Sequence, residues 1–459
     1  GRAVLENLVE GFEGEVVPIN PEYNELFGFK CYSDISSVSK KIDLVVVVVP
    51  AKIANKVVRQ AAEKGVKNIV VITAGYGEAG SLGADREREL REIAEQYDLN
   101  IVGPNSLGVI STPMNLNATF SPEEALSGPI SFLSQSGALV TAVLSWAADR
   151  GIGFRNIVSL GNKAVLDETD FLKEWGEEEG TDVIIAYLEG IEDGKEFIST
   201  AREVTKSTPI VMVKSGRTEA GARAVSSHTG TLAGSESAYR TGLEQAGIMR
   251  VENIQRLFDF AEVLRGQPLP KSDSVAVVTN SGGPGIMATD AMDVSGLSLT
   301  SFSEDTLRRL DRSLPDEANI YNPVDVLGDA DLERFEKAID AVLDDPKVGG
   351  VVVISYPSAI LEYKNLAELL VKVQKYNDKP IVACLMGGKK VRKAESILRE
   401  GGIPNYFDPE RAVRSLGALN KYKEIRGREY EKPTRFSVNR TKAREILDQV
   451  KARKDNRLG

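Results

Sequence analysis

Runs of apolar, β-branched residues alternate with amphipathic stretches through the first part of the chain. The runs predict strands and the amphipathic stretches predict helices, an alternation typical of βαβ units around a parallel sheet. The expected strands are Glu15–Ile19, Leu44–Val49, Ile69–Thr73 and Asn100–Val102, and the expected helices are Ile53–Lys64 and Asp85–Tyr97. A turn at Ser127-Gly128-Pro129 closes the series, so we expect a first α/β domain over residues 1–127.

Two further series of the same kind follow. The expected strands are Ile130–Leu133, Val183–Leu188 and Ile210–Val213 in one series, and Val275–Thr279, Gly350–Ser355 and Ile381–Leu385 in the next. They predict a second α/β domain over residues 128–267 and a third over residues 272–425, joined by a linker at Gly266–Pro270. The charged tail, residues 426–459, is predicted to be a linker that ends in a helix.

The second and third segments resemble each other. Residues 130–137 can be aligned with residues 275–282, and residues 208–216 with residues 379–387. The spacing differs between the two segments, so the pattern indicates one domain repeated with insertions rather than a short solenoid repeat. We expect two related α/β sheets facing each other.

Composition and charge exclude several classes of protein. The chain has 459 residues, 42% of them hydrophobic, and its 57 basic against 67 acidic residues give a net charge of −10. Electrostatic binding of nucleic acid or of anionic lipid over a large surface is therefore not expected. The longest apolar run, Leu44–Val49, is too short to span a membrane, and two cysteines are too few for a disulfide framework. We therefore expect a cytoplasmic protein. Because the chain opens on Gly1 rather than on methionine, we also expect that an N-terminal piece is missing.

Glycine turns after two of the predicted strands are candidate anion sites. Ser134, Gln135, Ser136 and Gly137 follow the first strand of the second segment, and the turn with Gly283 and Gly285 follows the first strand of the third. A helix that starts at such a turn presents free N–H groups and the positive end of its dipole, which favour a bound phosphate. Ordinary strand-to-helix turns have the same composition, so each turn alone is weak evidence and the pair is stronger.

His228 is the only histidine in the chain, and it lies in a segment rich in small hydroxylated residues. A neutral imidazole can attack a phosphoryl group, and N–H dipoles can stabilise the phosphohistidine that forms. A solvated or structural histidine is the alternative. Glu189 follows an apolar strand and is expected to orient the imidazole, unless it is simply a solvated carboxylate. Lys163 and Lys214 could neutralise phosphate, although loop lysines are commonly solvated.

In the first segment, three loops follow three predicted strands and would line one crevice. They contain Pro50 and Lys52, then Thr73 and Gly75, then Asn105. A Gly-x-Gly-x-x-Gly motif is missing near the N-terminus, so the residues do not support a dinucleotide site.

Together these motifs resemble the nucleoside-diphosphate-forming acyl-CoA synthetases, of which ADP-forming acetyl-CoA synthetase is the best-known type and to which succinyl-CoA synthetase is related. The resemblance covers residues 1 to 425. Its most specific part is the segment 226–234 around His228, with Gly103-Pro104-Asn105, Ser134-Gln135-Ser136-Gly137 and Asn322-Pro323-Val324-Asp325 in the expected order. It implies an α/β fold with a CoA-binding Rossmann-like domain followed by two flavodoxin-like parallel-sheet domains.

The resemblance also implies a function for most of these residues. Acyl-CoA and phosphate would give an acyl phosphate, His228 would take its phosphoryl group with Glu189 as partner, and the histidine loop would then swing to ADP. The two glycine turns would receive the phosphate of His228. For the turn Gly161-Asn162-Lys163 the phosphate contact is expected from the residues themselves, because Lys163 could neutralise the charge. The residues that would hold CoA and the acyl group are Pro50, Lys52, Thr73, Gly75 and Asn105.

Two departures from the family pattern affect the cofactors and partners. The family usually opens with a strand and a Gly-rich loop that we expect to precede Gly1, and the residues given after Arg426 are too few to form the family's ATP-grasp module. ADP or ATP with Mg²⁺ would therefore bind to a module in a longer chain or in a β subunit, within a homodimer or heterotetramer, and no metal site is expected in this chain. The resemblance implies acetate or another short acid, for instance a hydroxylated one, as the substrate, and branched and aryl acids remain open. An acyl-CoA-sensing regulatory module of a fused protein acetyltransferase and a nucleotide-binding scaffold are the alternatives.

Overall fold

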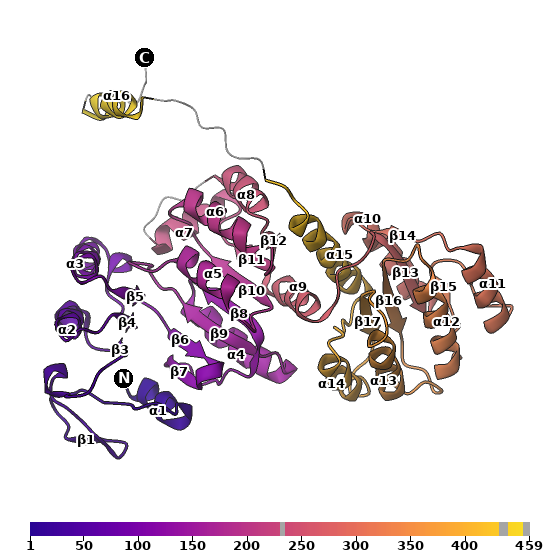
Figure 1. Cartoon of the computed structure of the whole chain (residues 1–459), viewed down its shortest axis with the longest axis horizontal. Coiled ribbons are helices and arrows are strands. Elements are labelled where there is room, and N and C mark those ends of the chain that lie inside the picture. Colours follow the sequence, from indigo (N-terminus) through magenta and orange to yellow (C-terminus); the bar gives the residue numbers. More distant parts are fainter. Residues whose placement is uncertain (230–234, 431–438, 453–459) are drawn as a thin grey trace. The chain divides into compact units, whose positions relative to one another are not determined.

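The computed structural model describes residues 1–229, 235–430 and 439–452. The chain divides into two compact units, Gly1–Arg426 and Gly427–Gly459. The described helix of the second unit is α16 (Arg440–Ala452). The described part of the first unit contains three sheets built mainly from parallel strands, which are labelled in Figure 1, and a two-stranded antiparallel sheet.

The first sheet is formed by β3 (Leu44–Val47), β4 (Asn68–Val71) and β5 (Asn100–Val102), which pair in parallel in that order. Its crossover helices are α2 (Ala51–Glu63) and α3 (Ser81–Tyr97), as expected for βαβ units. The shorter elements are α1 (Arg2–Gly11), β1 (Glu25–Leu26), β2 (Phe29–Lys30), η1 (Ile35–Ser37) and η2 (Gly77–Ala79). The predicted strand Glu15–Ile19 is wrong: only Ile19 forms a bridge there, with Tyr32, because Pro18 has no N–H for a ladder.

The second sheet has the strand order β12-β11-β10-β8-β9-β6-β7. Its parallel strands are β8 (Ser127–Ser134), β9 (Phe154–Ser159), β10 (Val183–Leu188), β11 (Ile210–Lys214) and β12 (Met249–Val251). Its helices are α4 (Gly137–Arg150), α5 (Glu168–Glu177), α6 (Gly194–Val204), α7 (Glu219–Thr229), α8 (Glu236–Gln245) and α9 (Ile254–Gly266).

Two antiparallel strands complete one edge of the second sheet. They are β6 (Gly108–Ser111) and β7 (Leu116–Thr119), joined by η3 (Thr112–Met114), and β6 pairs with β9. The second sheet thus begins within residues expected to belong to the first domain. Helix α1 packs against β7, so the start of the chain also contacts this sheet.

The third sheet has the order β14-β13-β16-β17, with β15 pairing to β13. Its strands are β13 (Ser274–Thr279), β14 (Ser298–Leu299), β15 (Val324–Asp325), β16 (Gly350–Ser355) and β17 (Ile381–Leu385). Its helices are α10 (Gly282–Val294), α11 (Glu304–Ser313), α12 (Leu332–Asp344), α13 (Tyr363–Gln374), α14 (Arg392–Glu400) and α15 (Pro409–Arg426).

A single hydrophobic core joins the second and third sheets. It contains Phe132 and Phe154 of the second sheet, Val277 of the third, and Leu416 and Leu419 of α15, all fully buried. Helix α15 packs against both α9 and α10, so it lies between the two sheets. Burial of this apolar surface stabilises the pairing of the two repeated units.

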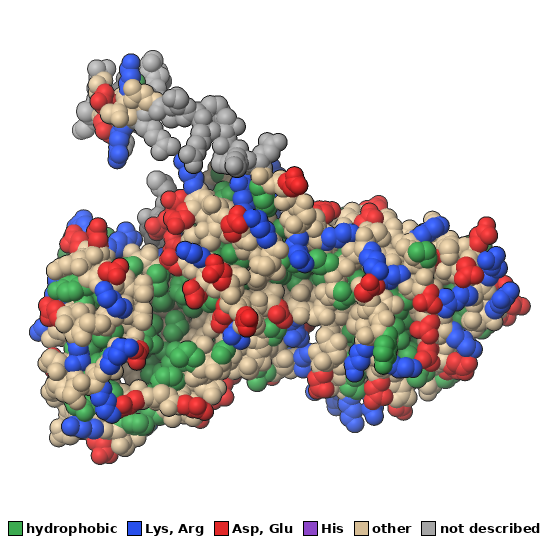
Figure 2. All heavy atoms as spheres, viewed as in Figure 1, with side chains coloured by type: hydrophobic (Ala, Val, Ile, Leu, Met, Phe, Trp, Pro, Cys, Tyr) green, Lys and Arg blue, Asp and Glu red, His purple; other side chains and the backbone are tan. Residues whose placement is uncertain are grey.

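The surface carries charges of both signs. On the face shown in Figure 2, Lys and Arg side chains are interspersed with Asp and Glu, and no large field of one sign forms there. None of the helices in the described part of the chain combines the length and apolar character that a membrane crossing requires.

Candidate functional site

The predicted site residues of the second segment lie at the carboxyl ends of parallel strands, where α/β proteins place their ligands. Gln135 follows β8, Glu189 follows β10, and Lys214 ends β11. Because β10 lies between β8 and β11, Glu189 occupies the middle of this edge.

The first glycine turn is a hydroxyl-stabilised helix start. The Ser134 hydroxyl donates to the carbonyl oxygen of Ser136 (2.9 Å) and accepts from its N–H (3.1 Å). The Ser136 hydroxyl accepts from Leu139 N–H as the N-cap of α4. Helix geometry leaves the amides of the first turn, including Gly137, without an intrahelical acceptor, so they can bind an anion.

The second glycine turn repeats this arrangement. The Thr279 hydroxyl donates to the carbonyl oxygen of Ser281 (3.0 Å) and accepts from its N–H (3.1 Å), just before α10. Gly285 lines a cavity of about 370 Å³ at this helix start, together with the carboxylate-bearing Asp325. Gly283 lies in the same first turn of α10. The two turns predicted as anion sites therefore share the hydrogen bonds of the strand-end hydroxyl, whereas Ser281, unlike Ser136, makes no side-chain N-cap hydrogen bond among the described residues.

Hydrogen bonds to the main chain fix the position of Glu189. The Gln135 side-chain oxygen accepts hydrogen bonds from the N–H groups of Glu189 (2.5 Å) and Gly190 (3.1 Å). The Lys163 ammonium donates to the carbonyl oxygen of Gly190 (3.0 Å). The loop that carries the candidate histidine partner is thus fixed from two sides.

Lys163 is buried rather than solvated. Its ammonium pairs with Glu168 at 2.9 Å, and the side chains are only 4% and 1% exposed. Burial raises the pKa of Glu168, and the neighbouring Lys163 charge opposes that rise. Glu168, the first residue of α5, had no signal in the sequence that marked it as part of this site.

Lys214, the last residue of β11, is also buried. Its ammonium donates to the carbonyl oxygen of Ser215 (2.7 Å) and lies 4.1 Å from the centre of the Tyr239 ring. Burial, and then the positive charge of Arg250, lower the pKa of Lys214 to about 8. Arg250 in turn forms a bidentate ion pair with Glu236 on α8.

His228 belongs to the last turn of α7. Its side chain, and residues 230–234 that follow, lie outside the described residues. Helix α7 starts shortly after β11, which places its beginning at the same edge as Glu189. The same helix contacts η2 of the first sheet, so it lies beside the loop that contains Gly75.

The loops of the first sheet that were expected to hold CoA come together at its carboxyl edge. The Thr73 hydroxyl donates to the carbonyl oxygen of Val49 (2.7 Å), and the N–H of Asn105 donates to the carbonyl oxygen of Thr73 (2.9 Å). Pro50 is the N-cap of α2, and Lys52 is exposed in its first turn. Gly75 and Asn105 both have positive φ, +101° and +57°, conformations that glycine and asparagine adopt most readily.

The turn Gly161-Asn162-Lys163 lies between these two groups of loops. The Asn162 side-chain nitrogen donates to Glu78 (2.6 Å) and Glu87 (2.9 Å), and its oxygen accepts from Asn105 (3.2 Å). Glu78 and Glu87 were not anticipated, because a solvated helix or turn carboxylate has the same appearance in a sequence. The phosphate contact expected of this turn stays a prediction.

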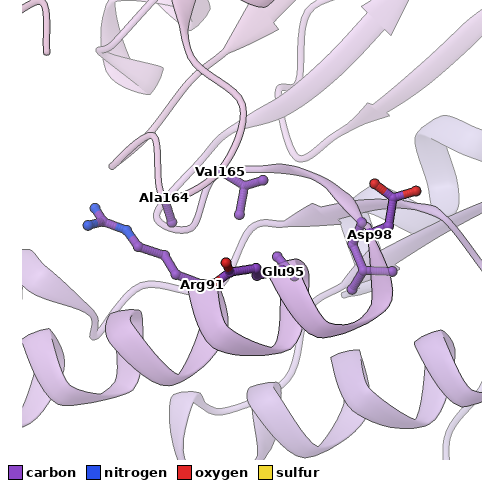
Figure 3. Close-up of a pocket in the computed structure, with 7 residues that line it drawn as sticks. Arg91, Glu95, Asp98, Ala164 and Val165 are labelled. Carbon is purple, nitrogen blue, oxygen red and sulfur yellow. The ribbon is translucent and has the colours of Figure 1, made fainter. Parts of the chain in front are cut away.

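A surface hollow of about 390 Å³ lies apart from the predicted residues. It is lined by Arg91, Ala94, Glu95, Asp98, Leu99, Ala164 and Val165. Figure 3 shows Ala164 and Val165 above the α3 face, with Arg91 and Asp98 towards its two ends. Within the described residues, no group of three or more His, Cys, Asp and Glu side chains could hold a metal ion.

Three protein-family models match the chain in sequence order. A CoA binding domain matches residues 1–112, a succinyl-CoA ligase like flavodoxin domain matches residues 127–264, and a Ligase-CoA domain matches residues 275–430. These spans correspond to the segments that carry the three sheets described above.

Similar proteins are known from archaea. The ADP-forming acetate–CoA ligase I of Archaeoglobus fulgidus is 45% identical over 98% of this chain, which spans 64% of that protein. The α subunit of the ADP-forming acetate–CoA ligase I of Pyrococcus furiosus is 40% identical over 94% of this chain and 95% of the subunit. A solved structure of the dinucleotide forming acetyl-coenzyme A synthetase 1 of Ca. Korarchaeum cryptofilum, with phosphate and ADP, matches 92% of each chain at 38% identity and a TM-score of 0.88.

Proposed function

Because the chain belongs to the family of ADP-forming acid–CoA ligases, we propose that it carries the CoA-binding and phosphoryl-carrying parts of such an enzyme. The reaction would convert acyl-CoA, ADP and phosphate reversibly into a carboxylic acid, CoA and ATP. Residues 1–127 would bind CoA, and residues 128–267 would carry the phosphohistidine. Residues 272–425 would supply the second phosphate-binding glycine turn, and residues 426–459 would lead to the nucleotide-binding part.

The chemistry proceeds through two intermediates. A phosphate oxygen attacks the thioester carbonyl, the C–S bond breaks, and CoA leaves as a thiol to give an acyl phosphate. A ring nitrogen of His228 then attacks phosphorus, and the P–O bond to the carboxylate breaks. A terminal oxygen of ADP takes the phosphoryl group from His228, which regenerates the free imidazole and forms ATP.

The role of each chain segment follows from its position. Glu189 would accept the imidazole N–H and orient the ring. The main-chain amides of the first glycine turn, formed by Ser134, Gln135, Ser136 and Gly137, would stabilise the phosphoryl group by charge-assisted hydrogen bonds. The amides around Gly283 and Gly285 in the second turn would do the same. The residues that would contact CoA and the acyl group are Pro50, Lys52, Thr73, Gly75 and Asn105.

One observation carries the proposal: helix α7, whose last turn contains His228, begins beside the strand edge of Glu189 and contacts η2 at the edge of the first sheet. The helix that carries His228 thus starts at the strand edge of the first glycine turn and contacts the sheet of the predicted CoA loops, which supports a phosphoryl carrier there. An acyl-CoA-sensing regulatory module would not need this arrangement, and the relatives described above are ligases.

Nucleotide and Mg²⁺ would bind to an ATP-grasp module in a longer chain or in a β subunit. The Archaeoglobus relative, which is longer than this chain, supports the first arrangement, and the Pyrococcus α subunit supports the second. The assembly would be a homodimer or heterotetramer, and the acid would be acetate or another short acid. Cys31 and Cys384 are buried free thiols, which supports a reducing compartment such as the cytoplasm.

The test is phosphoryl transfer from γ-labelled ATP to the enzyme assembled with its nucleotide-binding part. We expect acid-labile, base-stable label on the wild-type chain, discharge of that label on addition of acid and CoA, and no label on His228→Ala. Glu189→Gln is expected to label slowly because its ring partner is weakened. Full labelling of His228→Ala, or acyl-CoA binding without any labelling of the wild-type chain, contradicts the proposal.

A further inference from the structure

We propose that the turn Gly161-Asn162-Lys163 is a relay that couples occupancy of the CoA loops to the position of Glu189. Asn162 and Lys163 are then positioning residues that act through hydrogen bonds to the protein. This inference rests on the proposed function, since it assigns CoA to the loops of the first sheet and the phosphohistidine to the second.

The first half of the relay connects Asn162 to the CoA loop. The Glu78 carboxylate accepts from the N–H of Gly75 (2.5 Å), and the Glu87 carboxylate accepts from the N–H of Gly77 (3.1 Å). The Asn162 side chain donates to both carboxylates. Burial opposes ionisation of Glu78, but the hydrogen bonds from Asn162 and Gly75 outweigh it and hold its pKa below the usual range. The loop is therefore bound to Asn162 through the carboxylates of Glu78 and Glu87.

The main chain of the turn is tied to the same sheet. The N–H of Asn162 donates to the carbonyl oxygen of Pro104 (2.9 Å), and the N–H of Ala164 donates to that of Gly103 (3.0 Å). A Cβ atom on Gly161 would lie 2.1 Å from the Pro104 oxygen, so only glycine permits this approach. Any displacement of the loop that carries Asn105 must therefore move the turn.

The second half of the relay starts one residue later. The Lys163 ammonium contacts the carbonyl oxygen of Gly190 and the Glu168 carboxylate, and both side chains of the ion pair are buried. Gly161 and Lys163 have positive φ, +60° and +57°, so the turn is tight and its two ends shift together. Because Gln135 holds the amides of Glu189 and Gly190, a shift of Gly190 repositions Glu189.

The burial of the ion pair explains why Lys163 acts in this way. Removing a charge from a buried partner is costly, so the Lys163 ammonium keeps both Glu168 and the carbonyl oxygen of Gly190 as partners, and a shift of the turn is passed to the Gly190 loop through these contacts. A ligand that contacts Gly75 or Asn105 shifts the turn only if the ligand binds more tightly to one position of the turn than to another. The coupling free energy between the two sites equals that difference in binding free energy.

The experiment measures this coupling with an unreactive ligand. The enzyme, assembled with its nucleotide-binding part, is phosphorylated by γ-labelled ATP in single turnovers, with and without saturating desulfo-CoA. We expect the analogue to change the phosphorylation rate of the wild-type chain about fivefold or more, a typical size for allosteric coupling. In Asn162→Ala the ratio of the two rates is expected to fall to one.

Asn100→Ala is the matched control, and a double variant tests the second half of the relay. Asn100→Ala removes an exposed asparagine at the opposite end of β5, where its side chain bonds Asn68, and should keep the wild-type ratio. Lys163→Met combined with Glu168→Leu replaces the buried ion pair by apolar groups, so it is expected to fold while the ratio falls to one.

The outcomes separate the relay from the proposed function. Failure of the wild-type chain to label, or labelling of His228→Ala, overturns the function. Normal labelling with a ratio of one in the wild-type chain, or an unchanged ratio in Asn162→Ala, overturns the relay alone. A rise of more than about tenfold in the KM for phosphate, with an unchanged ratio, would instead make the turn a phosphate site.

Discussion

Arg411 on α15 forms a bidentate ion pair with Asp259 on α9. Its Nε lies 2.9 Å from one carboxylate oxygen and its Nη2 lies 2.6 Å from the other. The hydroxyl of Tyr406 donates to the main-chain oxygen of Asp259 (2.6 Å). These contacts join α9 and α15 at the interface between the second and third sheets, and Tyr406 belongs to the shared hydrophobic core.

Asp259→Ala is expected to destabilise the protein by about 2 kcal/mol, because it leaves a guanidinium beside a buried interface without its partner. The cost is below that of a fully buried pair, since the Arg411 side chain is 36% exposed. Glu424→Gln, which breaks an exposed pair with Lys421 on the same helix, should change stability by less than about 0.5 kcal/mol. Urea unfolding of both variants checks this, and equal midpoints would contradict it.

Lys214 is expected to give the protein a stability that rises with pH. Its pKa is about 8 in the folded protein and 10.5 ordinarily, so the unfolded chain binds more protons between these values. The penalty for burying the ammonium is complete below pH 8 and is relieved as the pH rises towards 10.5. Relative to Lys214→Met, the wild-type protein should gain about 2 kcal/mol of unfolding free energy between about pH 7.5 and about pH 9.5.

The measurement for Lys214 is urea unfolding of both proteins across that range. Charged neighbours such as Glu189 and Glu236 raise the pKa of Lys214, whereas Arg250 lowers it, and all of them remain in Lys214→Met. Parallel pH profiles for the two proteins would show that Lys214 is not the group responsible.

Gly161→Ala is expected to destabilise the protein by about 3 kcal/mol. The new methyl group would meet the Pro104 oxygen at 2.1 Å, and the position has a φ of +60° that strains any residue with a Cβ. Gly194→Ala, at the start of α6, is a suitable control because its φ is not positive and the described atoms leave space for a Cβ. Thermal unfolding should separate the two variants by several degrees.

Asn105 allows conformation and contact to be tested separately. Asn105→Gly keeps access to the positive φ of +57°, so its stability should stay near the wild-type value, whereas Asn105→Ala should lose about 1 kcal/mol. If the side chain contacts CoA, both variants should bind CoA about tenfold more weakly, the loss expected for one hydrogen bond to a charged group. Calorimetric titration with CoA measures this, and wild-type affinity in both variants would remove Asn105 from the site.

The parallel sheets and the two helix starts could be predicted from the sequence because their signals are local. A short β-branched run such as Ile210–Val213 has no amphipathic alternation, which is typical of a strand buried on both faces. The alignment of residues 130–137 with residues 275–282 anticipated that Ser134 and Thr279 would occupy equivalent positions. Their matching hydrogen bonds in the structure agree with that alignment.

The contacts between loops could not be predicted, because they depend on residues far apart in the chain. Asn162 contacts Glu78 and Glu87, which lie 84 and 75 positions away. Glu168 is only five positions from Lys163, yet its burial depends on how α5 packs beneath the strand edge. A carboxylate in a sequence gives no indication of whether it will be solvated or will hold a loop of another sheet.

The insertion of β6 and β7 into the second sheet determines how the protein can be divided. A gene fragment that begins at residue 127 would encode β9 without the strand that covers it, and the bare strand would offer its N–H and C=O groups to other molecules. Such a fragment should aggregate on expression, whereas one that begins near residue 106 keeps the hairpin and its edge intact. Mixing the aggregating fragment with a polypeptide that supplies residues 1–126 should restore solubility, because the missing edge is then provided in trans.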